Sequence, residues 1–158
     1  MYEFQQVDAS NPDFLTLVQL LNGELAARDG EDHVFYAQLN GLEDIRQVIV
    51  AYDARTHAAL ACGAIKHYAI GCVEIKRMFV RPQARGKGLA SQVLQALEAW
   101  AQSLGYAQTI LETGTSLPEA IGLYQKQGYT QIPNYGQYAG IETSVCFTKQ
   151  LHKSPSAT

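Results

Sequence analysis

The sequence predicts a single α+β domain built on a mixed, mostly antiparallel central sheet. Its 158 residues are 47% hydrophobic, which is enough chain and apolar content for one core. Apolar runs over residues 48–52, 58–68 and 71–80 are separated by short turns, a pattern typical of an antiparallel meander. The last run is followed by a glycine turn, an amphipathic helix and another strand, and such a unit forms one parallel crossover.

The N-terminal third is expected to contain a strand over residues 2–7 and then a long helix. Asn11 and Pro12 supply an N-cap and a proline at the first helical position. Apolar residues follow at helical spacing, namely Phe14, Leu17, Val18, Leu21 and Leu25. A polar loop is predicted over residues 28–32 and a second short helix over residues 42–48. In the meander that follows, Gly63 predicts a bulge or a close approach of another chain segment.

The second half alternates helices and strands. One face of a helix is marked by Leu89, Val93, Leu94, Leu97, Trp100, Ala101 and Leu104, and Gly105 stands where a helix C-terminus belongs. A strand over 108–112, a helix from Pro118 to about Gly128 and a turn-rich loop over 132–138 follow. A strand over 142–149 closes the fold. If its edge is exposed it could pair with a second copy, so a homodimer is possible.

The turn after Val80 is the strongest functional signal. Gly86 and Gly88 remove the side chains from a strand-to-helix connection, where the first helical N–H groups are unpaired and the helix dipole is positive. Bare backbone at such a point can close on a phosphate. Arg85 and Lys87 add positive charge. The sequence therefore predicts a site for a pyrophosphate or a similar anion.

Two known phosphate motifs fit this turn poorly. A P-loop is excluded because no glycine lies five residues before a Gly-Lys-Ser/Thr triplet. The dinucleotide fingerprint G-x-G-x-x-G/A fits its first two glycines, and Glu112 lies about where a ribose-binding acid would lie. Against it, Ser91 takes the third glycine's place, five residues separate Val80 from Gly86, and the chain offers one parallel unit only.

The turn matches a third motif better. Residues 83–88, Gln-Ala-Arg-Gly-Lys-Gly, resemble the Q/R-x-x-G-x-G/A motif of the GNAT acetyltransferase superfamily, and residues 120–129 resemble its A-x-x-L-Y-x-x-x-G-F segment. The resemblance covers roughly residues 58–150 and includes the order of strands and helices. Two positions depart from the pattern. Leu117 replaces a frequent asparagine that contacts the cofactor, and Tyr129 replaces the usual phenylalanine.

The resemblance implies a GNAT-like fold, with residues 1–152 as a single N-acetyltransferase domain and 153–158 as a frayed tail. It implies an acyl-CoA-dependent N-acyltransferase that moves acetyl from acetyl-CoA to a primary amine by direct attack in a ternary complex. The acceptor is a small-molecule amine or a peptide or protein amine. A non-catalytic acyl-CoA-binding regulatory module would keep the same glycine turn and remains the alternative.

The resemblance also implies where the cofactor, acetyl-CoA, lies. Backbone N–H groups over residues 85–91 would hold the pyrophosphate, and the pantetheine arm would bond to the strand at residues 78–80. That strand must part from the strand near residue 110 to leave a slot, and an N–H near Met78 or Phe79 would face the thioester oxygen. The expected cofactor-binding residues are Met78, Phe79, Val80, Arg85, Gly86, Lys87, Gly88, Leu89, Ala90 and Ser91.

Two side chains are the candidate catalytic residues. An alkyl amine with a pKa of about 10.4 is almost wholly protonated at pH 7, so a carboxylate must accept a proton. Glu74 occupies the position of the superfamily's frequent catalytic glutamate; pairing with Lys66 or Arg77 is the structural alternative. Glu112 is the second candidate base. Tyr124 would face the departing sulfur as a hydrogen-bond donor, or else simply pack beside Ala120 and Ile121.

Charge is uneven along the chain and suggests an acceptor wall. Residues 1–53 carry ten acids against two arginines, whereas residues 76–87 carry five of the twelve basic residues and no acid. An acidic wall suits a cationic amine, although an acidic loop can also be merely solvated. Candidate substrate residues are Asp29, Glu31, Asp32, His33, Tyr36, Glu112, Tyr135 and Tyr138.

Composition argues against several other classes of protein. The net charge of −3 does not favour nucleic acid, and the four histidines and three cysteines show no metal-ligand spacing. The cysteines are expected to be buried and reduced, without a catalytic histidine partner. The N-terminus does not resemble a signal peptide and no apolar run is long enough to span a bilayer. A cytoplasmic enzyme without metal, membrane or nucleic-acid partners is therefore expected.

Overall fold

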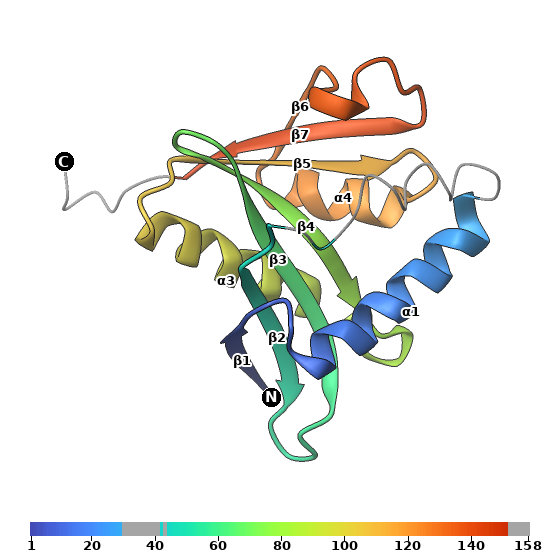
Figure 1. Cartoon of the computed structure of the whole chain (residues 1–158). Helices are drawn as coiled ribbons and strands as arrows, with labels where there is room; N and C mark the ends of the chain where they lie inside the picture. Colours follow the sequence, from blue (N-terminus) through green and yellow to red (C-terminus); the bar gives the residue numbers. More distant parts are fainter. Residues whose placement is uncertain (30–41, 43, 152–158) are drawn as a thin grey trace.

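A seven-stranded sheet organises the computed structural model, which describes residues 1–29, 42 and 44–151 (Figure 1). The strand order is β1-β2-β3-β4-β5-β7-β6. The first half of the chain contributes β1 (Tyr2–Val7), α1 (Pro12–Asp29), β2 (Gln47–Asp53), β3 (Ala59–Ala69) and β4 (Cys72–Val80). The second half contributes the 3₁₀ turn η2 (Pro82–Ala84), α3 (Leu89–Ser103), β5 (Gln108–Gly114), α4 (Pro118–Lys126), β6 (Thr130–Ile132), the 3₁₀ turn η3 (Gly136–Tyr138) and β7 (Ser144–Gln150).

The predicted sheet topology is confirmed. Strands β1 to β4 form an antiparallel meander, and β5, β7 and β6 are antiparallel to one another. Among the strands in the described part of the chain, β4 and β5 alone pair in parallel, and α3 connects them. The domain therefore has the mixed α+β architecture that the apolar runs and the glycine turn predict.

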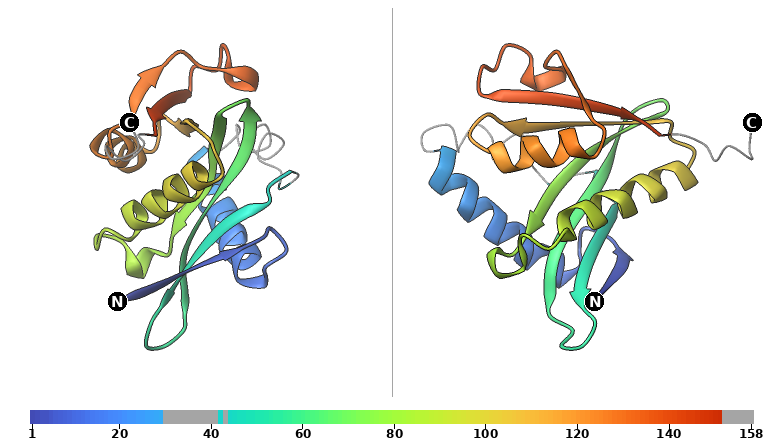
Figure 2. Two further views of the ribbon diagram at one scale, coloured as in Figure 1. Left: turned by 90° about the vertical axis from the view of Figure 1, so that its left-hand side faces the viewer. Right: turned by 180° about the vertical axis from the view of Figure 1, so that it is seen from behind.

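Helices cover both faces of the sheet. Figure 2 shows α1 on one face and α3 and α4 on the other. On the α1 face, Phe14 and Leu17 are fully buried against Val48, Val50 and Cys62. On the opposite face, α3 buries its apolar stripe in the larger core, with Val93, Leu94, Leu97 and Ala101 each fully buried.

The parallel pair at the centre of the sheet is short. Only the segment from Cys72 to Glu74 in β4 pairs with β5, opposite Gln108 to Ile110. Beyond this point the two strands diverge, as Figure 1 shows. The second half of β4 therefore keeps β3 on one side and has an open backbone edge on the other, which is the slot that the resemblance predicted.

A bulge interrupts β4 where the strands diverge. Lys76 lies opposite Ala64 and Phe79 lies opposite Cys62, so β4 contains one residue more than β3 over this interval. Arg77 is the extra residue and has a φ of 58°, a conformation that costs a non-glycine residue about 1–2 kcal/mol. In a regular strand Lys76 and Arg77 would point to opposite faces. Here both reach the α1 face, because Lys76 contacts Tyr138 and Arg77 contacts Asn22 in α1.

Gly63 lies in β3 beside this bulge, and the close approach predicted there is confirmed. A Cβ at Gly63 would lie 2.6 Å from Met78 Sδ and 2.7 Å from Leu97 Cδ1. We expect Gly63→Ala to lower the free energy of unfolding by about 1–3 kcal/mol, because a well-packed core resists an added methyl group. Urea unfolding measures this change.

Gly122 in α4 provides the matched control for Gly63. A Cβ there would meet nothing within 4 Å. Gly122→Ala should therefore raise stability by about 0.5–1 kcal/mol, since alanine favours a helix interior. Equal effects of the two substitutions would contradict the packing argument.

Three expectations about chain organisation are wrong. The helix expected over residues 42–48 does not form at the described positions, because β2 begins at Gln47 and Ile45 packs under α1 from an irregular segment. The polar loop expected over 28–32 does not begin at 28, since α1 continues to Asp29; residues 30–32 lie outside the described part. The strand expected over 142–149 is not at an edge, because β7 lies between β5 and β6. The homodimer expectation thereby loses the edge on which it was based.

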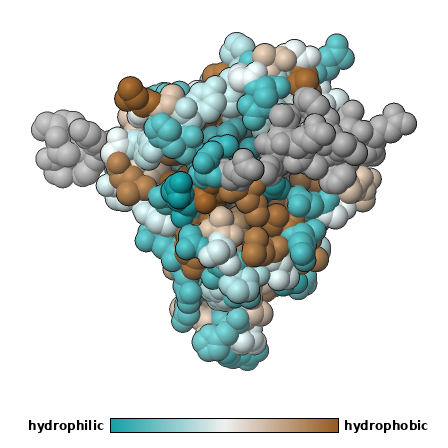
Figure 3. Space-filling view, in the orientation of Figure 1, coloured by the Kyte–Doolittle hydropathy of each residue, from teal (hydrophilic) through white to brown (hydrophobic). Residues whose placement is uncertain are grey.

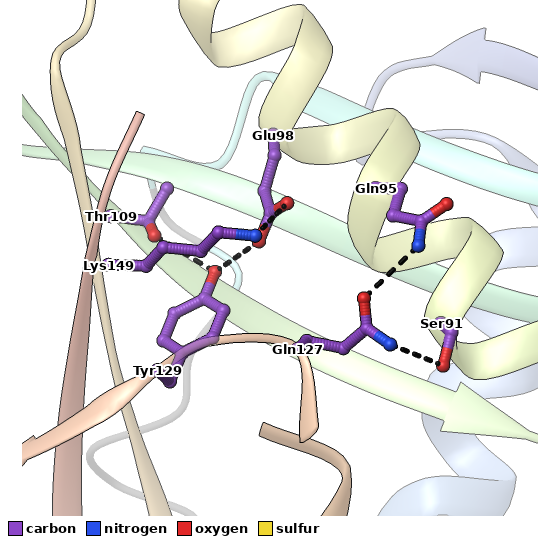
Figure 4. Close-up of polar contacts among 7 residues, drawn as sticks. All are labelled: Ser91, Gln95, Glu98, Thr109, Gln127, Tyr129 and Lys149. Atoms are coloured by element: carbon purple, nitrogen blue, oxygen red, sulfur yellow. Dashed lines mark hydrogen bonds and ion pairs between the residues drawn. The ribbon is translucent and has the colours of Figure 1, made fainter. Parts of the chain in front are cut away.

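The departure at Tyr129 has a structural consequence. Its hydroxyl donates to Glu98 Oε2 at 2.8 Å and lies 2.9 Å from Thr109 Oγ1, while Lys149 Nζ lies 3.0 Å from Glu98 Oε1 (Figure 4). Burial, and next the charge of Glu98, raise the pKa of Tyr129, so the phenol stays protonated. A phenylalanine at this position would leave Glu98, which is 8% exposed, without this donor.

Candidate active site

Two adjoining cavities open where β4 and β5 diverge. The first, of about 290 Å³, lies between the second half of β4, the end of β5 and α1. The second, of about 350 Å³, runs from the end of β4 along the glycine turn and the start of α3. They share six lining residues, Leu21, Leu25, Met78, Leu117, Ala120 and Tyr124. The two cavities therefore meet between α1, β4 and α4.

The glycine turn lines the second cavity with bare backbone. Gly86 and Gly88 both have a φ of 79°, and a Cβ on either would meet nothing within 4 Å. Glycine is therefore needed here for its conformation. Gly88 is the N-cap of α3 and provides no side chain to cap the helix. The Gln92 N–H donates the first i→i−4 hydrogen bond of the helix, to the Gly88 carbonyl at 3.2 Å. The N–H groups of residues 89–91 precede it and have no partner within the helix.

The Arg85 side chain is bound to other parts of the protein. Its Nη2 lies 2.8 Å from Glu24 Oε2 in α1, and its Nε donates to the Val80 carbonyl at 2.8 Å. Its guanidinium also lies over the Phe79 ring. The side chain thereby ties α1 to the end of β4, and the backbone of Arg85 is what remains for an anion.

Ser91 lies on the first turn of α3 and keeps a proton to donate. Gln127 Nε2 donates to Ser91 Oγ at 3.2 Å, and Gln95 Nε2 donates to Gln127 Oε1 at 3.1 Å (Figure 4). Because Ser91 Oγ accepts in this contact, its own O–H stays available for an acceptor in the second cavity. The Gln127 bridge also joins the C-terminal end of α4 to the start of α3.

Glu74 is held as a buried carboxylate in the first cavity. It is 5% exposed, its Oε2 accepts the Tyr135 hydroxyl at 2.6 Å, and its Oε1 lies 3.9 Å from Lys76 Nζ. The sequence suggested Lys66 or Arg77 as its ion-pair partner, and the structure gives Lys76 instead.

Tyr124 of α4 lines both cavities. It is 6% exposed and packs edge-on against Tyr129 in the core, so the packing role and the cavity position coexist. Burial, and next the charge of Glu112, raise the pKa of Tyr124. The phenol therefore stays protonated at neutral pH and has a proton to donate in a hydrogen bond.

The structure brings some of the expected substrate residues together and not others. Glu112 and Tyr138 line the first cavity; Glu112 accepts the Ser144 hydroxyl at 2.7 Å, and Tyr138 is 1% exposed. Tyr135 reaches the cavity only through Glu74. Asp29 is the last residue of α1. Glu31, Asp32, His33 and Tyr36 lie outside the described residues.

Lys76 and Arg77 are the charged lining residues of the first cavity that sequence reasoning did not assign to the site. Lys76 is 7% exposed, and its Nζ donates to the Tyr138 hydroxyl at 3.3 Å. Burial lowers the pKa of Lys76, while the nearby carboxylates of Glu74 and Glu112 oppose this effect. The spacing of two residues from Glu74 could have placed Lys76 on the same face. Arg77 carried no such signal, because its direction depends on the bulge.

One face of the molecule combines hydrophobic and hydrophilic residues. In the view of Figure 3, hydrophobic residues gather over the middle of the sheet beside α1, and hydrophilic residues border them. Among the described residues, no group of three or more His, Cys, Asp or Glu side chains could hold a metal ion. Within the same part of the chain, no helix has the length and apolar content needed to cross a membrane.

The parallel pair diverges beside a glycine turn at a helix start, and the adjoining cavity contains a buried glutamate. Comparison with known proteins identifies the class of enzyme, the acyl-CoA-dependent N-acyltransferases. The chain belongs to the Acetyltransferase (GNAT) family, whose model matches residues 14–129.

This chain is an N-acetyltransferase, and its named relatives are acetyltransferases or N-acetyltransferases. It is 33% identical over 121 residues to the IAA acetyltransferase of Azospirillum brasilense, covering 76% of this chain and 77% of that protein. It is 36% identical over 115 residues to the uncharacterized N-acetyltransferase YsnE of Bacillus subtilis, covering 70% and 76%.

Solved structures share the fold. A Klebsiella pneumoniae protein assigned to the acyl-CoA N-acyltransferases has a TM-score of 0.81 at 27% identity, covering 96% of this chain and 99% of that one. A GNAT acetyltransferase from Elizabethkingia anophelis, solved with acetyl-CoA bound, has a TM-score of 0.66 at 17% identity, covering 95% and 98%.

Proposed function

We propose that this N-acetyltransferase moves acetyl from acetyl-CoA to an amine by direct attack while both substrates are bound. The observation that carries the proposal is the junction of the two cavities at Met78 and Tyr124, with the buried Glu74 carboxylate lining the acceptor side. A donor in the second cavity and an acceptor in the first would meet there without a covalent enzyme intermediate. The described cysteines, Cys62, Cys72 and Cys146, are all buried and line neither cavity.

The donor would be held mainly by backbone. Residues 86 and 88–91 line the second cavity at the positive end of α3, and their amides would suit a pyrophosphate. The open edge of β4 beyond Glu74 suits the amide groups of a pantetheine arm, which would bond to it like a neighbouring strand. An N–H near Met78 or Phe79 would then stabilise the charge that develops on the thioester oxygen.

The transfer itself needs a proton acceptor and a stabilised leaving group. The acceptor nitrogen forms a bond to the acyl carbon, the carbon–sulfur bond breaks, and the sulfur leaves as a thiolate. The ammonium form first gives one proton to the Glu74 carboxylate, directly or through one water, and the neutral nitrogen then attacks. A second proton leaves the nitrogen as the carbon–sulfur bond breaks and passes through water to solvent. The Tyr124 hydroxyl donates a hydrogen bond to the thiolate; it does not protonate it, because its raised pKa makes it a weaker acid than a thiol.

The test is a thiol-release assay with acetyl-CoA and a broad panel of amines. Release of free CoA that depends on the acceptor, together with acetylated product, supports the proposal. Binding of acetyl-CoA without release for any amine favours a non-catalytic acyl-CoA-binding module. A double-reciprocal analysis with intersecting lines supports a ternary complex, whereas parallel lines would indicate a covalent intermediate.

A further inference from the structure

Arg77 is the most unusual charged group in the first cavity. It lines the cavity, and its Nη1 donates to Asn22 Oδ1 at 2.9 Å. Its Nε is buried and has no hydrogen-bond partner among the residues that the structure describes. A guanidinium offers five donors, and its fork matches a carboxylate in two parallel hydrogen bonds. The described partners of Arg77 therefore leave room for an anionic ligand.

The bulge in β4 is what places Arg77 in this cavity. A regular strand would have directed Arg77 toward the α3 face, where Met78 now packs against the core cluster that contains Leu97 and Val93. The positive φ of Arg77 instead brings two consecutive cations, Lys76 and Arg77, onto the acceptor side. A strained backbone that presents a charged side chain to a cavity is a reason to look for a binding role.

The formal charges of the described residues that line the first cavity sum to zero. Glu74 and Lys76 form an ion pair, and Glu112 acts on Lys76 as a second nearby carboxylate. With Arg77, the described lining residues carry two formal negative and two formal positive charges. A purely cationic acceptor would add an unbalanced charge to a partly desolvated site, whereas an acceptor with both an amine and a carboxylate adds none.

We propose that the acceptor is an amino acid, a small molecule whose amine is acetylated and whose carboxylate is bound by Arg77. This inference rests on the proposed function. Residues 74 and 77 lie about 10 Å apart along β4 at ~3.3 Å per residue, and both side chains are long. One small molecule can therefore offer its nitrogen to Glu74 and its carboxylate to Arg77. Leu21 and Leu25 of α1 line the same cavity and would contact its side chain.

Matched acceptors test the carboxylate requirement. We would compare phenylalanine with 2-phenylethylamine and with phenylalanine methyl ester, and leucine with 3-methylbutylamine, in the thiol-release assay. The expected result is a kcat/KM at least tenfold higher for each amino acid than for its partners without the charge. Equal or higher values for the decarboxylated amines would overturn the proposal.

An Arg77→Asn variant tests the residue itself. Asparagine tolerates a positive φ, so the bulge is retained while the guanidinium is removed. We expect the KM for the amino acid to rise at least tenfold, with kcat and the Kd for acetyl-CoA unchanged and with the KM for the decarboxylated amine unchanged. Arg55→Asn, in the exposed turn between β2 and β3, should leave all four values as they are. An equal loss for both acceptors would mean that Arg77 is merely structural and would overturn the proposal.

A binding measurement separates this inference from the proposed function. Calorimetric titration of the CoA-loaded protein with phenylalanine and 2-phenylethylamine needs no turnover. Binding of phenylalanine at least tenfold tighter than that of 2-phenylethylamine, with the difference lost in Arg77→Asn, supports the carboxylate site. If this result is obtained but no acceptor is acetylated, the proposed function alone fails. Equal binding of the two ligands overturns the site even if both are acetylated.

Discussion

Glu74→Gln should reduce kcat by about 10²–10⁴-fold while leaving the Kd for acetyl-CoA unchanged. Glutamine preserves the size of the side chain and an oxygen that can accept the Tyr135 hydroxyl, but it cannot take up a proton from the acceptor nitrogen. The range is that of positioned general bases. Steady-state thiol release gives kcat, and calorimetry gives the Kd.

Two further variants complete the Glu74 experiment. Glu112→Gln tests the second carboxylate of the cavity, and a larger loss of kcat there than in Glu74→Gln would transfer the role of base to Glu112. Glu142→Gln, at an exposed position, is the matched control and should retain full activity. A Glu74→Gln enzyme with normal kcat would exclude Glu74 as the base and leave proton removal to Glu112 or to water.

Gly88→Val should raise the Kd for acetyl-CoA at least tenfold. A β-branched residue at a φ of 79° is a true conformational outlier, and relief of the strain would move the amides that open α3. Strain of about 1–2 kcal/mol corresponds to a factor of about ten in affinity at ~1.4 kcal/mol per decade. Isothermal titration with acetyl-CoA measures the effect.

The glycine in the turn between β3 and β4 provides the matched control. Gly71 has a φ of 75°, a Cβ there would also meet nothing within 4 Å, and it lines neither cavity. Gly71→Val should lower the melting temperature by an amount similar to Gly88→Val but leave the Kd for acetyl-CoA unchanged. Equal losses of affinity in both variants would show that general destabilisation, and not the amide cradle, weakens binding.

Most of the fold was predictable because its signals are local. The alternation of apolar residues marks β2 to β5, and Pro12, Gly105 and Pro118 mark helix ends through fixed backbone preferences. β6 was missed because three residues, two of them exposed, show no pattern. The false helix over 42–48 arose because Ile45 and Val48 are spaced like residues on one helical face, yet both pack under α1 from non-helical backbone.

The candidate site was predictable only where a residue's chemistry is tied to its position in the chain. The glycine turn, Glu74 and Tyr124 follow from a strand, a turn and a helix that the sequence defines. Arg77 could not be placed, because nothing in the sequence marks a positive φ at an arginine. Leu21 and Leu25 were read as core residues of α1, and their position at the junction of the cavities depends on how α1 crosses the sheet.

One turn of α1 contributes to both halves of the site, and it can therefore couple the binding of the donor to the binding of the acceptor. Leu21 and Leu25 border the two cavities, and Glu24 between them holds Arg85 at the glycine turn. If one ligand displaces this helix, the affinity of the protein for the other ligand changes. Thermodynamic linkage then requires reciprocity: the factor by which the donor changes the acceptor's affinity equals the factor by which the acceptor changes the donor's.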